Sequence, residues 1–87
     1  YDPALGIEDY TIEGLNYYPN PTEGFVIIDA TVKINKVTVF DMLGKKVLEQ
    51  VGEFNSMNLN TSNLSVGNYL AKVESENNAQ IIKLIKN

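Results

Sequence analysis

Apolar and polar residues alternate along the last third of the chain with the two-residue period of a half-buried β-strand. Two such runs predict the last two strands, at 68–76 and 80–86. In the first run, one face carries Tyr69, Ala71 and Val73. In the second run, Ile82 and Leu84 can face a core. A turn at Asn77 and Asn78 separates the runs, because Asn tolerates a left-handed backbone.

Earlier in the chain, β-branched and aromatic residues are frequent and turn residues recur at short intervals, which predicts more strands. These are expected at 15–18, 25–30, 36–41, 45–50 and 57–60. We expect 51–56 to be a loop and 61–67 to be a polar connection. No window keeps an apolar period of 3.6 residues over three turns. The pattern therefore predicts an all-β fold, an immunoglobulin-like antiparallel β-sandwich of about seven short strands.

The most distinctive string is the loop Pro19–Gly24. Pro19 and Pro21 fix φ and lack a main-chain donor, so this loop must leave any central ladder. Gly24 is expected to let the chain reverse. Together with Asn20, these residues predict a rigid surface loop. A recognition loop is the alternative, since a rigid backbone loses little entropy on binding.

The string Asp41–Lys45 predicts a hairpin turn. The carboxylate of Asp41 is expected to accept hydrogen bonds from main-chain N–H groups two or three residues on, and Gly44 to take a positive φ. A phosphate site would need several glycines, so that interpretation is weaker. Gly67 is the expected turn residue at the end of the later polar connection.

The composition excludes several kinds of chemistry. The 87 residues suffice for one domain and contain no Cys and no His, which excludes disulfides, histidine triads and histidine-ligated zinc. The net charge of −4 makes nucleic acid a poor partner. No apolar run approaches the roughly 20 residues that span a bilayer. We expect no catalytic residue, no metal, no cofactor and no small-molecule substrate.

Two groups of side chains suggest binding sites, and each has a simpler interpretation. The carboxylates lack the spacing of a calcium loop, so a solvated acidic face is expected of Glu8, Asp9, Glu13, Glu23 and Asp29. Tyr17, Tyr18 and Tyr69 would suit a sugar-stacking platform, although tyrosines also pack at strand ends. The platform supports an alternative function, an accessory adhesion or carbohydrate-binding module of a secreted enzyme.

Four strings in this order resemble the type A C-terminal sorting domain of type IX secretion system (Por secretion system) cargo. They are Tyr17–Gly24 (YYPNPTEG), Val37–Val47 (VTVFDMLGKKV), Leu64–Tyr69 (LSVGNY) and Lys83–Asn87 (KLIKN). The resemblance covers about residues 15–87. It implies a non-catalytic immunoglobulin-like domain at the end of an exported cargo protein.

The resemblance also implies a route and partners. Such a domain passes through the periplasm and directs its cargo across the outer membrane to the cell surface or the extracellular space. The partners are the translocon, the upstream cargo and a sortase-like protease that removes the domain. We expect 1–10 to be a linker or a first strand from the cargo and 11–87 to be the sorting domain, a piece of a longer chain.

The end of the chain carries the terminal signal that the resemblance implies, namely Lys83, Leu84, Ile85, Lys86 and Asn87. Its simpler interpretation is the last strand of the sandwich. As a signal, it would be bound by a partner through strand addition or through charge. An exposed edge strand would also let the isolated domain dimerise.

Overall fold

A computed structural model describes Ile12, residues 14–76 and residues 78–87. Its strands are β1 (Asn16–Tyr18), β2 (Phe25–Phe40), β3 (Lys46–Asn60), β4 (Gly67–Ser75) and β5 (Ala79–Lys86). All the strand pairs are antiparallel. Within these residues no helix is long and apolar enough to cross a membrane. The expected linker at 1–10 lies outside the described residues.

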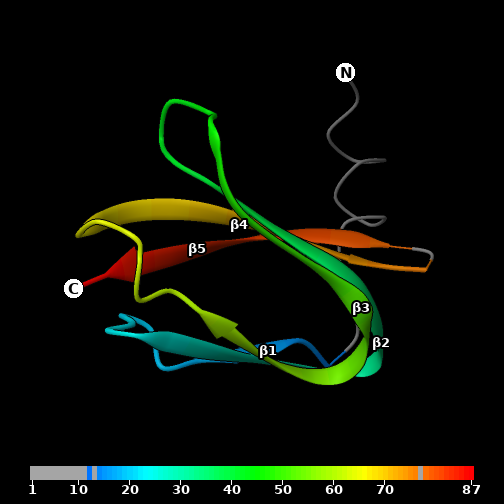
Figure 1. Ribbon diagram of the computed structural model, residues 1–87. Coiled ribbons are helices and arrows are strands. Elements are labelled where there is room, and N and C mark those ends of the chain that lie inside the picture. The colour runs from blue at the N-terminus through cyan, green and yellow to red at the C-terminus, as the bar shows by residue number, and fades with distance from the viewer. Residues whose placement is uncertain (1–11, 13, 77) are drawn as a thin grey trace.

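A single sheet curls over itself to form two layers, because β2 and β3 run through both (Figure 1). In one layer, the start of β2 pairs with β1 and with the end of β3. In the other, the end of β2 pairs with the start of β3 and with β4, and β5 follows β4. The register shifts between Asp29 and Lys36, where β2 passes from one layer to the other.

The predicted sandwich of antiparallel strands is therefore confirmed, but the described residues form five strands, where about seven were predicted for the chain. Each long strand joins segments that were predicted separately, namely 25–30 with 36–41 in β2 and 45–50 with 57–60 in β3. The predicted loop at 51–56 is wrong, because these residues continue β3. Between Val51 and Phe54, β3 takes one step more than β2 takes between Lys36 and Ile34. Such a bulge bends a strand and keeps it paired.

Gly52 lies in this bulge, and the close approach of an aromatic ring explains why glycine is needed there. A Cβ at this position would lie 2.2 Å from atoms of the Phe54 ring. The ring is partly buried and packs against the core. The close approach is between two residues of β3 itself, and it allows the strand to bend at the bulge.

The core fills the space between the two layers. Ile82 and Leu84, which were predicted to face a core, are 3% and 1% exposed, and Tyr69, Ala71 and Val73 of β4 are buried beside them. Opposite them, Val26, Ile28 and Leu59 are fully buried in the other layer. Burying a side chain of this size stabilises the fold by roughly 1.5–3 kcal/mol relative to leaving it exposed. The terminal strand is therefore part of the core.

The turn after β2 forms at the predicted residues, but the Asp41 carboxylate bonds to N–H groups two and four residues on, where two or three were expected. The carboxylate of Asp41 accepts hydrogen bonds from the N–H groups of Leu43 and Lys45, each at 2.9 Å. Gly44 has a φ of +88°, which an L side chain adopts only with strain. Leu43 is 94% exposed, so the turn projects from the sandwich.

A second turn prediction, the one at Gly24, differs from the structure. Gly24 has no positive φ, so its conformational freedom does not produce the reversal after β1. The loop is held instead by hydrogen bonds to distant segments, beginning with the N–H of Thr61, which donates to the Gly24 carbonyl at 3.0 Å. Between β4 and β5, the N–H of Ser75 donates to the carbonyl of Asn78 at 2.8 Å, whereas Asn77 lies outside the described residues.

Candidate functional site

The residues of the implied terminal signal form the last part of β5, at the edge of the sheet beside β4. Leu84 is 1% exposed and Lys86 is 7% exposed, so both side chains point inward. Lys83 and Asn87 are exposed, and Ile85 is half-buried. The signal is thus a folded strand that offers only alternate side chains to the surroundings.

Lys86 places a charged group where the alternation of β5 demands an inward side chain. Its Nζ donates a hydrogen bond to the carbonyl of Leu64 at 2.9 Å. A buried ammonium is tolerated only with such a partner, and its apolar stem adds packing. Lys86 therefore ties the end of the chain to the connection between β3 and β4.

Asn20 holds the outer edge of the same strand. Its Nδ2 donates to the carbonyl of Lys83 at 3.1 Å, and its Oδ1 accepts from the N–H of Ile85 at 3.0 Å. A side-chain amide carries one donor group and one acceptor, as a peptide group does. Asn20 therefore occupies the position that a neighbouring strand would take.

Thr22 continues this contact along the edge. Its N–H donates to the carbonyl of Ile85 at 2.7 Å, and its carbonyl accepts from the N–H of Asn87 at 2.9 Å. Thr22 and Lys86 form an isolated parallel bridge. The loop Pro19–Gly24 does leave the central ladder, as predicted, but it pairs with the edge of β5.

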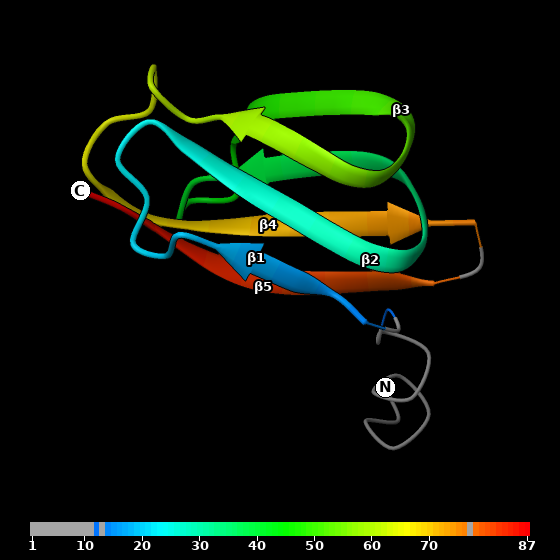
Figure 2. The same ribbon diagram turned by 90° about the horizontal axis from the view of Figure 1, so that it is seen from below.

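Buried hydroxyl groups fix this loop from behind. Thr22 Oγ1 donates to the Phe25 carbonyl and lies 3.1 Å from Thr61 Oγ1, and both threonines are buried. The N–H of Leu64 donates to the Thr61 carbonyl at 3.0 Å. We call Asn20, Thr22, Thr61 and Leu64 the clasp. Figure 2 shows the loops that carry it beside the C-terminus.

Gly67 and Tyr69 connect the clasp to β4. Gly67 begins β4 and lies opposite Lys86 in the register. The Tyr69 hydroxyl donates to the carbonyl of Ser65 at 2.7 Å, and its ring is buried in the core. The strings Leu64–Tyr69 and Lys83–Asn87 therefore lie side by side where β4 pairs with β5.

Sequence reasoning found the loop and the tail but missed the contact between them. Asn20 was predicted only as a turn residue, and Thr22 and Thr61 were not singled out. Asn20 bonds to residues 63 and 65 positions away, and no local pattern reports contacts at that separation. A threonine that is fully buried beside prolines has no signature in an alternation pattern.

The three tyrosines do not form a stacking platform. Tyr69 is 7% exposed and belongs to the core, whereas Tyr18 is 47% exposed. Tyr17 is half-buried and packs against the core. Of the five carboxylates considered as a calcium site, only Glu23 and Asp29 are described, and the described residues contain no group of three or more potential metal ligands.

The Tyr18 hydroxyl donates to Asp29 Oδ2 at 2.7 Å, just before the loop begins. This bond is the main reason why the pKa of Tyr18 is raised. The pKa of Asp29 is lowered, first by the hydrogen bond from Ser56 and second by that from Tyr18. The bonds favour the neutral phenol and the ionised carboxylate.

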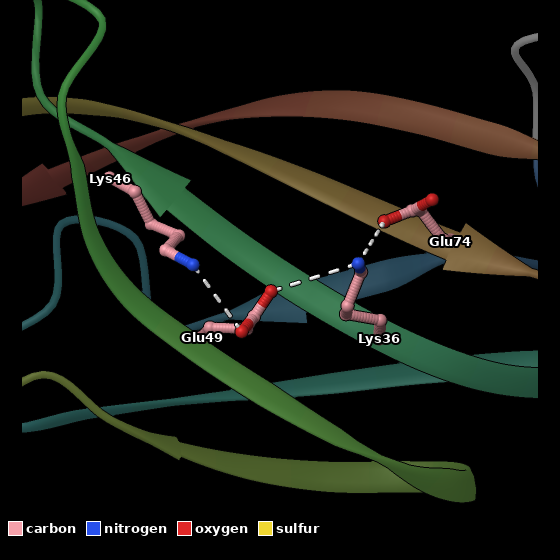
Figure 3. Close-up of polar contacts among 4 residues, drawn as sticks. All are labelled: Lys36, Lys46, Glu49 and Glu74. Atoms are coloured by element: carbon pink, nitrogen blue, oxygen red, sulfur yellow. Dashed lines mark hydrogen bonds and ion pairs between the residues drawn. The ribbon is translucent and has the colours of Figure 1, made fainter.

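The outer face of the layer that contains β5 is charged, and its charges are unevenly paired. Lys36 Nζ lies 3.7 Å from Glu49 and 3.8 Å from Glu74, and Lys46 Nζ lies 3.5 Å from Glu49 (Figure 3). These partly exposed pairs contribute only about 0–1 kcal/mol each. These pairs neutralise the charges of Lys36 and Lys46 on the half of the face that lies nearer β3.

The family model of secretion system C-terminal sorting domains matches residues 16–87 of this chain, which include the clasp and the tail. The chain is similar to the ulvan lyase NLR42 of Nonlabens ulvanivorans, with 34% identity over 77 residues. That match covers 86% of this chain and 14% of the lyase, so the chain spans a small part of that relative.

A solved structure with a similar fold is that of the CBM51-2 and INT domains of ZmpB from Clostridium perfringens. The TM-score is 0.54 at 27% sequence identity. The superposition covers 78% of this chain and 17% of that chain. The likeness supports the sandwich architecture.

Proposed function

Since this chain belongs to the family of secretion system C-terminal sorting domains, we propose that it is the last domain of a longer exported protein and carries that protein's address. The domain is a non-catalytic type IX secretion signal, and its destination is the outer membrane surface or the extracellular space. Passage through the periplasm and removal by a sortase-like protease complete the proposed route. Residues 1–10 would link the cargo to the sorting domain at 11–87.

The observation that carries this proposal is the clasp. The strings that resemble the family do not converge on a cleft, as catalytic residues would. Asn20 and Thr22 hold the main chain of the tail, and Leu64 holds the ammonium of Lys86. Such contacts fix the position of a terminal strand and leave its outward side chains for a partner.

The residue inventory supports a function without chemistry. The sequence contains no His and no Cys, which supply most general bases and nucleophiles. The activity in the name of the Nonlabens relative belongs to a protein of which this chain matches 14%. In this proposal, any activity of the exported protein belongs to its cargo domain and not to the sandwich.

The test is a fusion of residues 1–87 to the C-terminus of a periplasmic reporter, expressed in a bacterium that has a type IX system. We expect the reporter on the cell surface, where added protease reaches it. The matched control is the same fusion in a strain without the translocon, which should retain it in the periplasm. Retention of the folded fusion in both strains would contradict the sorting function.

An accessory carbohydrate-binding module is the second candidate, because the similar solved structure includes a domain named CBM51-2. The aromatic side chains favour it less, since Tyr69 is in the core and the Tyr18 hydroxyl is engaged by Asp29. Binding of the isolated domain to a glycan array, lost in Tyr18→Ala, would support this candidate over the first.

A further inference from the structure

A partner could contact the tail through its inward side chains, through its outer main-chain edge or through its outward side chains. In the folded domain the first two are not accessible. Leu84 and Lys86 point into the core, so their side chains are not accessible. The outer main-chain edge of residues 83–87 is occupied by Asn20 and Thr22. A partner that meets the folded domain therefore finds the exposed side chains of Lys83 and Asn87 and the half-buried Ile85.

These outward side chains are not alone on the surface. In the register of β4 with β5, Lys83 lies opposite Leu70, and Ile81 lies opposite Lys72. Leu70 is 37% exposed and Ile81 is 62% exposed, although both are large and apolar. We call Leu70, Lys72, Ile81, Lys83 and Ile85 the β4–β5 face.

The charges of this face are available for a partner. Lys36 and Lys46, on the other half of the same layer, are engaged by Glu49 and Glu74 (Figure 3). Among the residues that the structure describes, Lys72 and Lys83 form no ion pair. In a chain with a net charge of −4, two unpaired ammonium groups beside exposed Leu70 and Ile81 make a distinct cationic and apolar surface.

On the premise that the chain is a sorting domain, we propose that the export machinery docks on the folded β4–β5 face and does not bind the tail as an extended peptide. The partner is a protein surface with an apolar centre flanked by carboxylates, which complements Leu70 and Ile81 between Lys72 and Lys83. Lys72 is the deciding residue, because it lies outside the tail in sequence but on the neighbouring strand, opposite Ile81 and diagonal to Lys83.

The experiment reverses charges in the reporter fusion that carries residues 1–87. Lys72→Glu and Lys83→Glu are each expected to lower the surface signal about tenfold, the effect of a docking contact worth roughly 1.4 kcal/mol. The matched controls are Lys33→Glu and Lys45→Glu, which change the net charge equally at exposed lysines outside the face. Both controls should be exported like the unmodified fusion.

Melting temperatures of the isolated domains separate docking from folding. Lys72 is exposed and unpaired, so its charge reversal should leave the melting temperature nearly unchanged. Where Lys72→Glu lowers it, Lys72→Gln removes the charge at similar length and is expected to reduce export while the fold persists.

Each outcome decides between the interpretations. Normal export of Lys72→Glu with loss of export in Lys83→Glu would overturn the docking face in favour of a linear tail signal. Normal export of both variants would overturn it as well. Retention of the unmodified fusion in a secreting host would instead remove the sorting function, and the docking face with it.

Discussion

The loop Pro19–Gly24 and the turn Asp41–Lys45 look alike in sequence, since each combines an Asn or Asp with a glycine between two strands. Their hydrogen bonds go to different places. The carboxylate of Asp41 bonds to N–H groups two and four residues on, within its own turn. The amide of Asn20 bonds to main-chain groups 63 and 65 residues away, on β5.

The Asp41–Lys45 string therefore encodes a local turn, whereas the Pro19–Gly24 string encodes a tertiary contact with β5. The Asp41–Lys45 turn needs only its own residues and projects from the sandwich, with Leu43 94% exposed. The Pro19–Gly24 loop depends on β5, which lies at the edge of the sheet and is far away in the chain. Paired substitutions test this difference, with one residue changed in the loop or in the tail that it holds and a matched residue changed in the Asp41–Lys45 turn.

The largest difference is expected between Leu84→Ala and Leu43→Ala. Leu84 is 1% exposed in the clasped strand, so its truncation should lower the free energy of unfolding by about 2–5 kcal/mol. Leu43 is almost fully exposed, so the same truncation should change it by less than about 0.5 kcal/mol. Urea denaturation of the isolated domain measures both. Equal effects would show that the tail is not integral to the core.

The next pair removes the side chains that make the hydrogen bonds, Asn20→Ala and Asp41→Ala. Each loses two bonds, with an expected loss of about 1–3 kcal/mol. Hydrogen exchange separates them. Asn20→Ala should speed exchange of the Ile85 amide, whereas Asp41→Ala should speed exchange at Leu43 and Lys45 only.

The Asn20→Ala variant carries a second readout. Removing the amide uncovers main-chain groups at the edge of β5, and an uncovered edge favours pairing with a second copy. Sedimentation should then detect concentration-dependent dimers of Asn20→Ala and not of Asp41→Ala. An unchanged Ile85 exchange rate and a monomeric Asn20→Ala would contradict the role of the clasp as an edge cover.

A smaller effect is expected from Gly44→Ala and Gly24→Ala. Gly44 has a φ of +88°, so alanine should cost about 1–2 kcal/mol. Gly24 has no positive φ and open space at its Cβ position, so alanine there should be neutral or stabilise by up to about 1 kcal/mol. Thermal unfolding of the two variants checks the order. A larger loss at Gly24 would restore the expectation that its freedom makes the reversal.

The smallest effect concerns pH at the start of the Pro19–Gly24 loop. The pKa of Asp29 is lowered in the fold, so its stabilisation is present above the ordinary carboxyl range and is lost as pH falls through the folded value. The pKa of Tyr18 is raised in the fold. The contribution of its phenol to stability is therefore present below the ordinary phenol range and is lost as pH rises through the folded pKa.

Asp29→Asn should therefore flatten the acid limb of a plot of melting temperature against pH. Tyr18→Phe removes the phenol and should flatten the alkaline limb. Because both side chains are exposed to solvent, the changes should be minor beside those of the core and clasp variants. An acid limb that is identical in Asp29→Asn and the unmodified domain would contradict the assignment.

Local alternation was enough to predict which side chains of the last two strands face the core, because a strand's two faces follow from its own sequence. It failed at 51–56 and at the number of strands. Gly52 looks like a loop residue, but it belongs to a bulge in which the Phe54 ring takes the space of a Cβ. A bend that keeps its pairing is decided by the partner strand.

Adjacent residues and composition were enough to predict most strand segments, the position of the Asp41–Lys45 turn and the exclusion of histidine and cysteine chemistry. The role of the Pro19–Gly24 loop, and the contacts that hold its Asn20 and the buried ammonium of Lys86, could be learned only from the tertiary structure. The reason is physical. Asn20, Thr22 and Lys86 satisfy polar groups on segments far away in the chain, and only folding brings those segments within hydrogen-bonding distance.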